Sequence, residues 1–252
     1  MLLLLLLPTT ILLPPLARAR AGEIIGGWEA QPHSRPYMAF VKIGVEGSCR
    51  GFLIREDMEV TAAHCNCNLG NISMLLGAHN VEIDELGRQK IWVRHRIPHG
   101  EYNDETYEND IMLLQLRHKT NLTQTVGTIP LPQREVKEGA VCSVASWSWT
   151  SSKTNTQPTL TLQEVKLKVM SNNMCPSWQY LQYSPSRMLC VGDPRRVRHH
   201  SWLADSGGPL VCDGKAHDIV SYGKPDELAP QVFTKVSKYV SLIKKTLCKL
   251  KS

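Results

Sequence analysis

Stretches in which apolar residues occupy alternate positions recur along the chain. Four of them span residues 37–43, 91–97, 110–116 and 160–170. A period of two is typical of β-strands with one buried face. Turn-forming residues separate these stretches, and no internal repeat or low-complexity segment intervenes. The pattern therefore predicts an all-β protein.

The last segment has a different period. Its apolar residues are spaced three or four positions apart, at Val236, Tyr239, Val240, Ile243 and Leu247. This spacing places them on one face of a helix. The sequence thus predicts a single amphipathic helix at the C-terminal end of a β-rich chain.

Residues 1–21 predict a secretory signal peptide. The leucine-rich run after Met1 is broken by three prolines, so it is too short and too interrupted for a helix that spans a membrane. Small residues in Ala19-Arg20-Ala21 predict cleavage after Ala21. The alternative is an uncleaved signal anchor, which the prolines disfavour. The positive charges follow the apolar run instead of preceding it, which is unusual.

Residues 22–252 could form one large β domain or two small ones on length alone. The whole chain has a net charge of +6, which falls to +5 when the two arginines and one glutamate of residues 1–23 are removed. Basic residues cluster at 195–200 and near the C-terminus. These clusters are either solvated surface or a site for polyanions such as sulfated proteoglycans. Nothing resembles a nucleic-acid-binding module.

A single hydroxyl lies between an acid and two glycines in Ala204-Asp205-Ser206-Gly207-Gly208. Adjacent glycines allow a sharp bend that exposes the serine. A serine is a weak nucleophile unless a base and a group that orients the base lie nearby. His64, in Thr-Ala-Ala-His-Cys, is the candidate base, and Asp110, at the start of an apolar run, is the candidate orienting group.

The order His64, Asp110, Ser206, with these flanks, resembles the chymotrypsin-like serine proteases and not the subtilisins or the α/β-hydrolases. The resemblance extends from Ile24 to the C-terminus. It is closest to the granzyme, chymase and cathepsin G branch, as judged by the motifs Ile-Ile-Gly-Gly at 24–27, His-Ser-Arg-Pro-Tyr-Met-Ala at 33–39 and Leu-Gly-Ala-His-Asn at 76–80.

The resemblance implies a fold of two packed six-stranded antiparallel β-barrels with a C-terminal α-helix. Residues 24–252 would form the peptidase domain, with the site in the cleft between the barrels. We expect the helix to dock against the second barrel. No cofactor and no metal are implied, and the expected partners are protein or peptide substrates.

Eight cysteines in a secreted chain indicate disulfides, and their spacing alone allows 105 connectivities. The resemblance implies three pairs, which are Cys49 with Cys65, Cys142 with Cys212, and Cys175 with Cys190. Cys67 and Cys248 are left over. A metal site at His64, Cys65 and Cys67 would have too few ligands once Cys65 is in a bridge. Asn71 and Asn121 are acceptors for N-glycosylation.

The resemblance also implies activation by proteolysis. Gly22-Glu23 is similar to the activation dipeptide of granule proteases, whose removal frees the amine of Ile24. In the family this ammonium group folds inward and pairs with the acid before the catalytic serine, here Asp205. An unpaired buried carboxylate is unfavourable by several kcal/mol, so the pairing can order the loops around the site.

The resemblance also assigns a role to each site residue, according to its position in the family's motifs. His64 would be the general base for Ser206, and Asp110 would hold the imidazole in the right tautomer. The backbone N–H groups of Ala204 and Ser206 fall at the oxyanion hole. These assignments define the catalytic part of the hypothesis.

Substrate recognition is also implied. Ser221, Tyr222 and Gly223 resemble the strand that pairs with an extended peptide. His200 lies where trypsin-like relatives have an aspartate, and Gln231 lies where relatives that select acidic residues have an arginine. Cleavage after lysine or arginine is therefore disfavoured, and a chymase-like or other non-tryptic preference is expected.

Several positions depart from the family pattern. Ala204 replaces the glycine of the oxyanion hole, and Ser146 and Ser148 replace both glycines of an Ala-Gly-Trp-Gly run beside it. Arg50 and Asp218 replace two further glycines. Alanine at 204 keeps the backbone N–H donor, but its methyl group restricts the backbone beside the leaving group. If the donor were lost from the oxyanion hole, the rate would typically fall by about 10² to 10³.

Two hypotheses of different class follow. The first is a secreted, granule-stored serine endopeptidase that is acylated at Ser206, and the intact His64, Asp110 and Ser206 set supports it. The second is a catalytically impaired homologue that binds glycans or microbial anions, and the altered oxyanion region supports it. A lipase or esterase is disfavoured because Ala204 breaks the Gly-x-Ser-x-Gly motif.

Overall fold

The structure is a computed structural model that describes residues 27–67, 70–150, 159–177, 182–192, 206–223 and 230–250. The predicted signal peptide and activation dipeptide lie outside these residues. None of the helices in the described ranges is long and apolar enough to cross a membrane.

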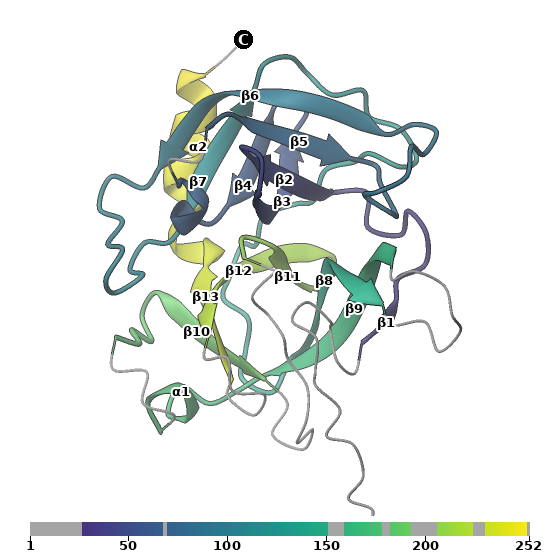
Figure 1. Cartoon of the computed structure of the whole chain (residues 1–252). Helices are drawn as coiled ribbons and strands as arrows, with labels where there is room; N and C mark the ends of the chain where they lie inside the picture. Colours follow the sequence, from purple (N-terminus) through teal and green to yellow (C-terminus); the bar gives the residue numbers. More distant parts are fainter. Residues whose placement is uncertain are drawn as a thin grey trace, which may run out of the picture.

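The first barrel is built from six strands of residues 38–116 in the closed order β2-β3-β4-β7-β6-β5 (Figure 1). All neighbouring pairs are antiparallel. The strands are β2 (Met38–Ile43), β3 (Gly47–Arg55), β4 (Met58–Thr61), β5 (Ile72–Leu76), β6 (Gln89–Pro98) and β7 (Met112–Leu116). A short 3₁₀ helix, η1 (Ala63–Cys65), follows β4.

The second barrel is a ring in the order β8-β9-β10-β13-β12-β11, closed by pairing of β8 with β9. Its strands are β8 (Val141–Thr150), β9 (Thr159–Val169), β10 (Met188–Gly192), β11 (Pro209–Cys212), β12 (Lys215–Gly223) and β13 (Gln231–Lys235). The short strand β1 (Trp28–Glu29) adds to β9, and helix α1 (Met174–Ser177) follows β9. The two-barrel fold expected from the resemblance is therefore confirmed.

The strands predicted from alternation are present with small shifts. The clearest difference is at residues 110–116, where β7 begins only at Met112. Asn109 has a φ of 57°, which turns the chain immediately before Asp110 and keeps that residue out of the strand. The shift matters because it leaves Asp110 in a loop at the end of the barrel.

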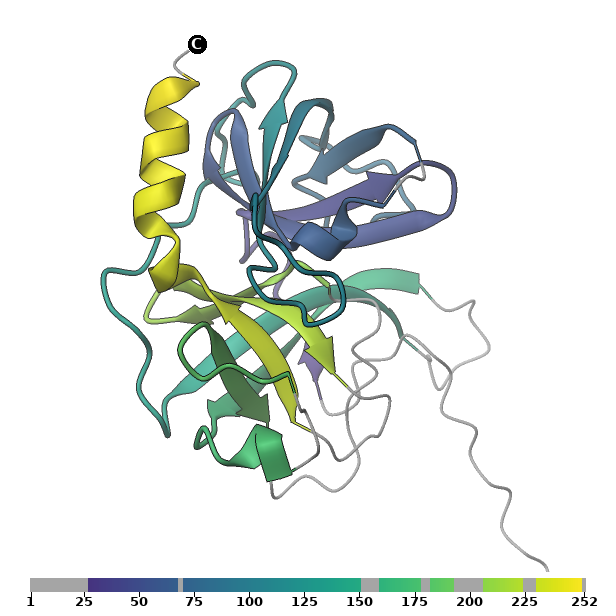
Figure 2. The same ribbon diagram turned by 90° about the vertical axis from the view of Figure 1, so that its left-hand side faces the viewer.

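The C-terminal helix departs from its expected place. A 3₁₀ turn, η2 (Val236–Lys238), precedes helix α2 (Val240–Lys249), which runs alongside the first barrel in both views (Figures 1 and 2). Ile243 belongs to the same buried cluster as the first-barrel core. The expectation of docking against the second barrel is wrong, because β13 ends near the junction and the helix continues across it.

Three disulfides join the pairs that the family resemblance implies. They are Cys49–Cys65, Cys142–Cys212 and Cys175–Cys190. The first ties β3 to η1, and the second ties β8 to β11. Cys67 and Cys248 are free, the former partly buried and the latter exposed.

Glu59 and Asp218 are buried acidic side chains with carboxyl oxygens that lack a hydrogen-bond partner. Glu59, on β4, has no exposed surface and lies opposite Leu53 and Leu114 in the strand register. Neither of its carboxyl oxygens has a hydrogen-bond partner. Burial raises the pKa of Glu59 well above its ordinary value, and burial also raises the pKa of Asp218 on β12. Both groups therefore favour the neutral form.

Glu59 makes the stability of the protein depend on pH. The folded-state pKa is raised, so the folded protein binds more protons than the unfolded one, and stability falls as pH rises above the ordinary value of 4.5. We predict that Glu59→Gln flattens this fall between pH 4.5 and 8. Glu59→Leu should raise the free energy of unfolding at neutral pH by about 1–3 kcal/mol, because it removes an unsatisfied buried group. Urea unfolding at several pH values measures both effects, and parallel pH curves for wild type and Glu59→Gln would contradict this account.

Candidate active site

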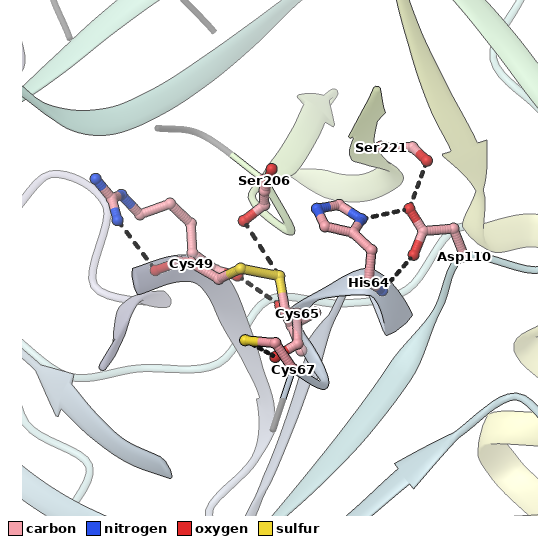
Figure 3. The surroundings of a disulfide bond; sticks show 9 residues. Cys49, His64, Cys65, Cys67, Asp110, Ser206 and Ser221 are labelled. Carbon is pink, nitrogen blue, oxygen red and sulfur yellow. Dashed lines mark hydrogen bonds and ion pairs between the residues drawn. A yellow bond between two sulfur atoms is a disulfide. The ribbon is translucent and has the colours of Figure 1, made fainter. Parts of the chain in front are cut away.

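His64 is placed at the junction of the barrels by the 3₁₀ turn η1 (Figure 3). The next residue, Cys65, anchors this turn to β3 through its disulfide with Cys49. The His64 side chain is 21% exposed, so one side of the ring remains accessible. The turn therefore holds the imidazole at the surface while its backbone is fixed.

Asp110 is completely buried beside His64. Its Oδ1 accepts a hydrogen bond from the backbone N–H of His64 at 2.9 Å, and its Oδ2 lies 2.7 Å from His64 Nδ1. The hydroxyl of Ser221, on β12, donates to the same Oδ2 at 2.5 Å. Donors from both barrels thus hold one carboxylate, which fixes the ring orientation and leaves Nε2 on the opposite side.

The loop that carries Asp110 is anchored through Asn109. Asn109 donates to the backbone oxygen of Glu101 at 2.8 Å, and its own side-chain oxygen accepts from the hydroxyl of Tyr239 at 3.0 Å and from Arg187. Burial raises the pKa of the Tyr239 phenol, which keeps it protonated as a donor. The residues before the C-terminal helix therefore help to place Asp110.

Ser206 lies on the side of the His64 ring that faces away from Asp110 (Figure 3). Its backbone oxygen accepts a hydrogen bond from the N–H of Arg50 on β3 at 2.8 Å. Among the hydrogen bonds of the described residues, none joins the Ser206 hydroxyl to the His64 ring. The pairing of His64 with Asp110, together with the position of Ser206 beside the same ring, brings these three residues to one place (Figure 3).

Gly207, directly after Ser206, has a φ of 85° and is packed closely against the first barrel. A Cβ at this position would lie 2.2 Å from Thr61 Oγ1 and 2.4 Å from the backbone oxygen of Arg50. Only glycine allows both this backbone conformation and this approach. The close contact brings the segment that carries Ser206 against the residues that lead to His64.

Aromatic side chains form a wall beside the imidazole. Tyr107 packs edge-on against His64 with ring centroids 5.8 Å apart. Its ring is also tilted against that of Tyr222, with centroids 5.0 Å apart. Tyr107 has a φ of 56°, in the left-handed region. The sequence motifs do not single out Tyr107, although it lies only three residues before Asp110.

Gln231 lies against Gly223 at the start of β13. A Cβ on Gly223 would lie 1.6 Å from Gln231 Oε1, so the amide occupies the space above that glycine. Gln231 is 3% exposed, and its Nε2 has no hydrogen-bond partner. A buried, neutral amide thus borders the predicted specificity pocket.

Several predicted site residues lie outside the described part of the chain. These are Ile24, His200, Ala204 and Asp205, and the Ser148 side chain is also not described. Cys49, His64 and Cys65 offer ligand atoms within 4.8 Å of one another. Both sulfurs are joined in a disulfide, so neither is available as a thiolate ligand.

Comparison with known proteins agrees with this geometry. The sequence model of the trypsin family, described as "Trypsin", matches residues 24–243. The chain belongs to the trypsin family of serine proteases. It is 48% identical to mast cell protease 3 of Ovis aries, over 92% of each chain, and 45% identical to cathepsin G of Homo sapiens, over 96% of this chain and 94% of that protein.

Further similarities place this trypsin-family chain in the granzyme, chymase and cathepsin G branch. It is 47% identical to granzyme B of Homo sapiens, over 96% of this chain and 97% of that protein. A solved structure named "Structure of GrC" is 42% identical and superposes with a TM-score of 0.79, covering 88% of this chain and 99% of that one.

The close packing at Gly207 gives a stability prediction for this trypsin-family fold. Gly214 also has a positive φ, 70°, but nothing lies within 4 Å of where its Cβ would be. We predict that Gly214→Ala costs about 1 kcal/mol for the backbone conformation alone. Gly207→Ala should cost several times more, because the methyl group meets a backbone oxygen. Thermal unfolding of the two variants measures the difference, and equal losses would argue against tight packing at Gly207.

Proposed function

We propose that this chain is a secreted, granule-type serine endopeptidase that cleaves peptide bonds through an acyl-enzyme on Ser206. The observation that carries the proposal is the buried Asp110 paired with His64, with Ser206 on the free side of the ring. A base held by a third group is what a weak serine nucleophile requires. Membership of the trypsin family supports the same chemistry.

The proposed roles follow from the positions of the atoms. Ser206 Oγ attacks the substrate carbonyl, and its proton passes to Nε2 of His64. Asp110, paired with Nδ1, stabilises the imidazolium that forms, and the proton then goes to the leaving amine. The proposal does not require a hydrogen bond between Ser206 and His64 before substrate binds. Such catalytic hydrogen bonds are often long or misaligned without substrate, and a serine side chain can rotate among three staggered positions.

The edge of β12 is the proposed binding site for the substrate backbone. β11 pairs with β12 only as far as Ile219, whereas β13 pairs with β12 as far as Gly223. Ser221, Tyr222 and Gly223 therefore continue past the end of β11. An extended peptide added here would pass beside Tyr107 and His64.

The proposed specificity is non-tryptic. Gln231 is buried against Gly223 and has no charge with which to pair a lysine or arginine of the substrate. It also fills part of the space above that glycine. Apolar or aromatic side chains are the proposed preference at the cleavage site.

Processing and storage are proposed from the sequence. Residues 1–21 would direct secretion, and removal of Gly22-Glu23 would free Ile24. Storage in secretory granules is proposed because the chain is similar to mast cell protease 3 and to granzyme B. Exposed lysines on α2, at Lys244, Lys245 and Lys249, support sulfated proteoglycans as partners.

A fluorophosphonate probe tests the proposed chemistry. We predict that the protein with its N-terminus at Ile24 is labelled at Ser206. The variants His64→Ala and Ser206→Ala should lose labelling, because the first removes the base and the second removes the nucleophile. Labelling in the His64→Ala variant should fall by at least about 10³-fold, as expected for a residue of a catalytic unit. Mass spectrometry of the labelled peptide measures the effect.

The alternative hypothesis makes different predictions for the same experiment. A wild-type protein that is unlabelled, becomes labelled after Ala204→Gly and binds heparin would be an impaired homologue that acts by binding. Labelling of wild type that persists in His64→Ala would contradict the proposed mechanism altogether.

Gln231 gives a separate test of specificity. We predict that wild type cleaves substrates with phenylalanine or leucine before the scissile bond at least about tenfold faster, in kcat/KM, than those with lysine, a difference of about 1.4 kcal/mol. Gln231→Glu should raise cleavage after lysine, because it supplies a carboxylate at the pocket. Gln231→Met, which has a similar size and no charge, is the matched control. Cleavage after lysine that rises equally in both variants would show that space, not charge, limits it.

A further inference from the structure

The buried side chain of Arg50 bridges the two barrels. Arg50 is on β3 of the first barrel and is 2% exposed. Its Nε donates to the hydroxyl of Ser146 at 3.0 Å, and its Nη2 donates to the backbone oxygen of Trp147 at 2.7 Å. Both acceptors are on β8 of the second barrel. The guanidinium therefore connects strands that belong to different sheets.

Aromatic rings enclose the same guanidinium. Its carbon lies 4.6 Å from the centroid of Phe40 and 5.7 Å from that of Trp147, and these two rings pack edge-on with centroids 5.9 Å apart. Phe40 comes from the first barrel and Trp147 from the second. Cation–π contact is strongest where water is excluded, as it is here. The Arg50 guanidinium group is thus held by two aromatic rings as well as by hydrogen bonds.

Arg50 and Ser146 depend on each other chemically. The resemblance places glycine at both positions, and glycine could supply neither the guanidinium nor the hydroxyl that accepts from it. Ser146 has no exposed surface, so a buried hydroxyl there requires a partner. The two substitutions, which the sequence presents as separate losses of glycine, form one complementary contact.

The main chain of Arg50 holds the segment of Ser206. Its N–H donates to the backbone oxygen of Ser206 at 2.8 Å, and its own oxygen accepts from the hydroxyl of Thr61 at 2.7 Å. That oxygen also lies against Gly207. The position of Arg50 relative to the second barrel therefore sets the position of Ser206.

We propose that Arg50 and Ser146 form an inter-barrel clamp that positions the main chain at Ser206, with Arg50 as a positioning residue for the proposed acylation. This inference rests on the proposed function for its kinetic consequence only. Arginine suits the role because its planar fork carries several donors in fixed directions and keeps its charge at any physiological pH. The clamp acts on the nucleophile and not on the substrate strand β12.

The test compares Arg50→Gly, Ser146→Gly and the double variant by the rate of fluorophosphonate labelling and by kcat and KM. Arg50→Gly should slow labelling by about tenfold, equivalent to about 1.4 kcal/mol of transition-state stabilisation, and lower kcat with little change in KM. Ser146→Gly should slow labelling severalfold. The double variant should be no slower than Arg50→Gly, because Ser146 has lost its donor already.

Arg55→Ala is the matched control. Arg55 is also on β3 and donates to Asp57 and to the backbone oxygens of Leu247 and Leu250, away from Ser206. It should lower stability without slowing labelling.

Arg50→Lys should recover part of the rate that Arg50→Gly loses, since lysine keeps one charged donor. The clamp would be overturned if the rate losses of Arg50→Gly and Ser146→Gly multiply in the double variant. It would also be overturned if Arg50→Gly is labelled at the wild-type rate.

Hydrogen exchange separates failure of the clamp from failure of the proposed function. The backbone amide of residue 50 donates to Ser206, so its exchange rate reports on this contact without any catalysis. Exchange should be faster in Ser146→Gly than in wild type and unchanged in Arg55→Ala. An unlabelled wild type with this pattern would reject the protease and keep the clamp, whereas unchanged exchange in Ser146→Gly would reject the clamp itself.

Discussion

The carboxylate of Asp110 is the contact on which the arrangement of the site depends. A fully buried carboxylate is costly unless several donors satisfy it, and here the donors come from His64 in the first barrel and from Ser221 in the second. The site is therefore complete only when the barrels are docked. Asn109 and Tyr239 extend this dependence to the start of the C-terminal helix, which crosses from the second barrel onto the first.

Backbone packing at Ser206 provides the second connection. Gly207 approaches Thr61 and Arg50 so closely that no side chain fits, and Arg50 donates to the Ser206 carbonyl. The segment that carries the candidate nucleophile is thus packed against the strand that leads to His64. Tight, directional contacts of this kind fix reacting groups more effectively than loops alone can.

The polar residues that replace glycines differ in how the fold accommodates them. Arg50 and Ser146 satisfy each other, so their burial produces a specific contact between barrels. Asp218, by contrast, has one carboxyl oxygen without a partner. Glu59, which is not one of these replacements, is likewise buried, and neither of its carboxyl oxygens has a partner. Such carboxyl groups lower stability as they ionise. A change at a glycine position is therefore not in itself evidence of an impaired site.

The β-rich fold, the terminal helix and the candidate residues His64, Asp110 and Ser206 could be predicted from the chain alone, because alternation and local motifs depend on neighbouring residues. Family resemblance also predicted the three disulfide pairs that the structure contains. Three features became evident only in the folded protein: the helix packs on the first barrel, Arg50 meets Ser146, and Glu59 is buried. These contacts join residues far apart in the chain, and their energy depends on burial and on partners, neither of which a local pattern specifies.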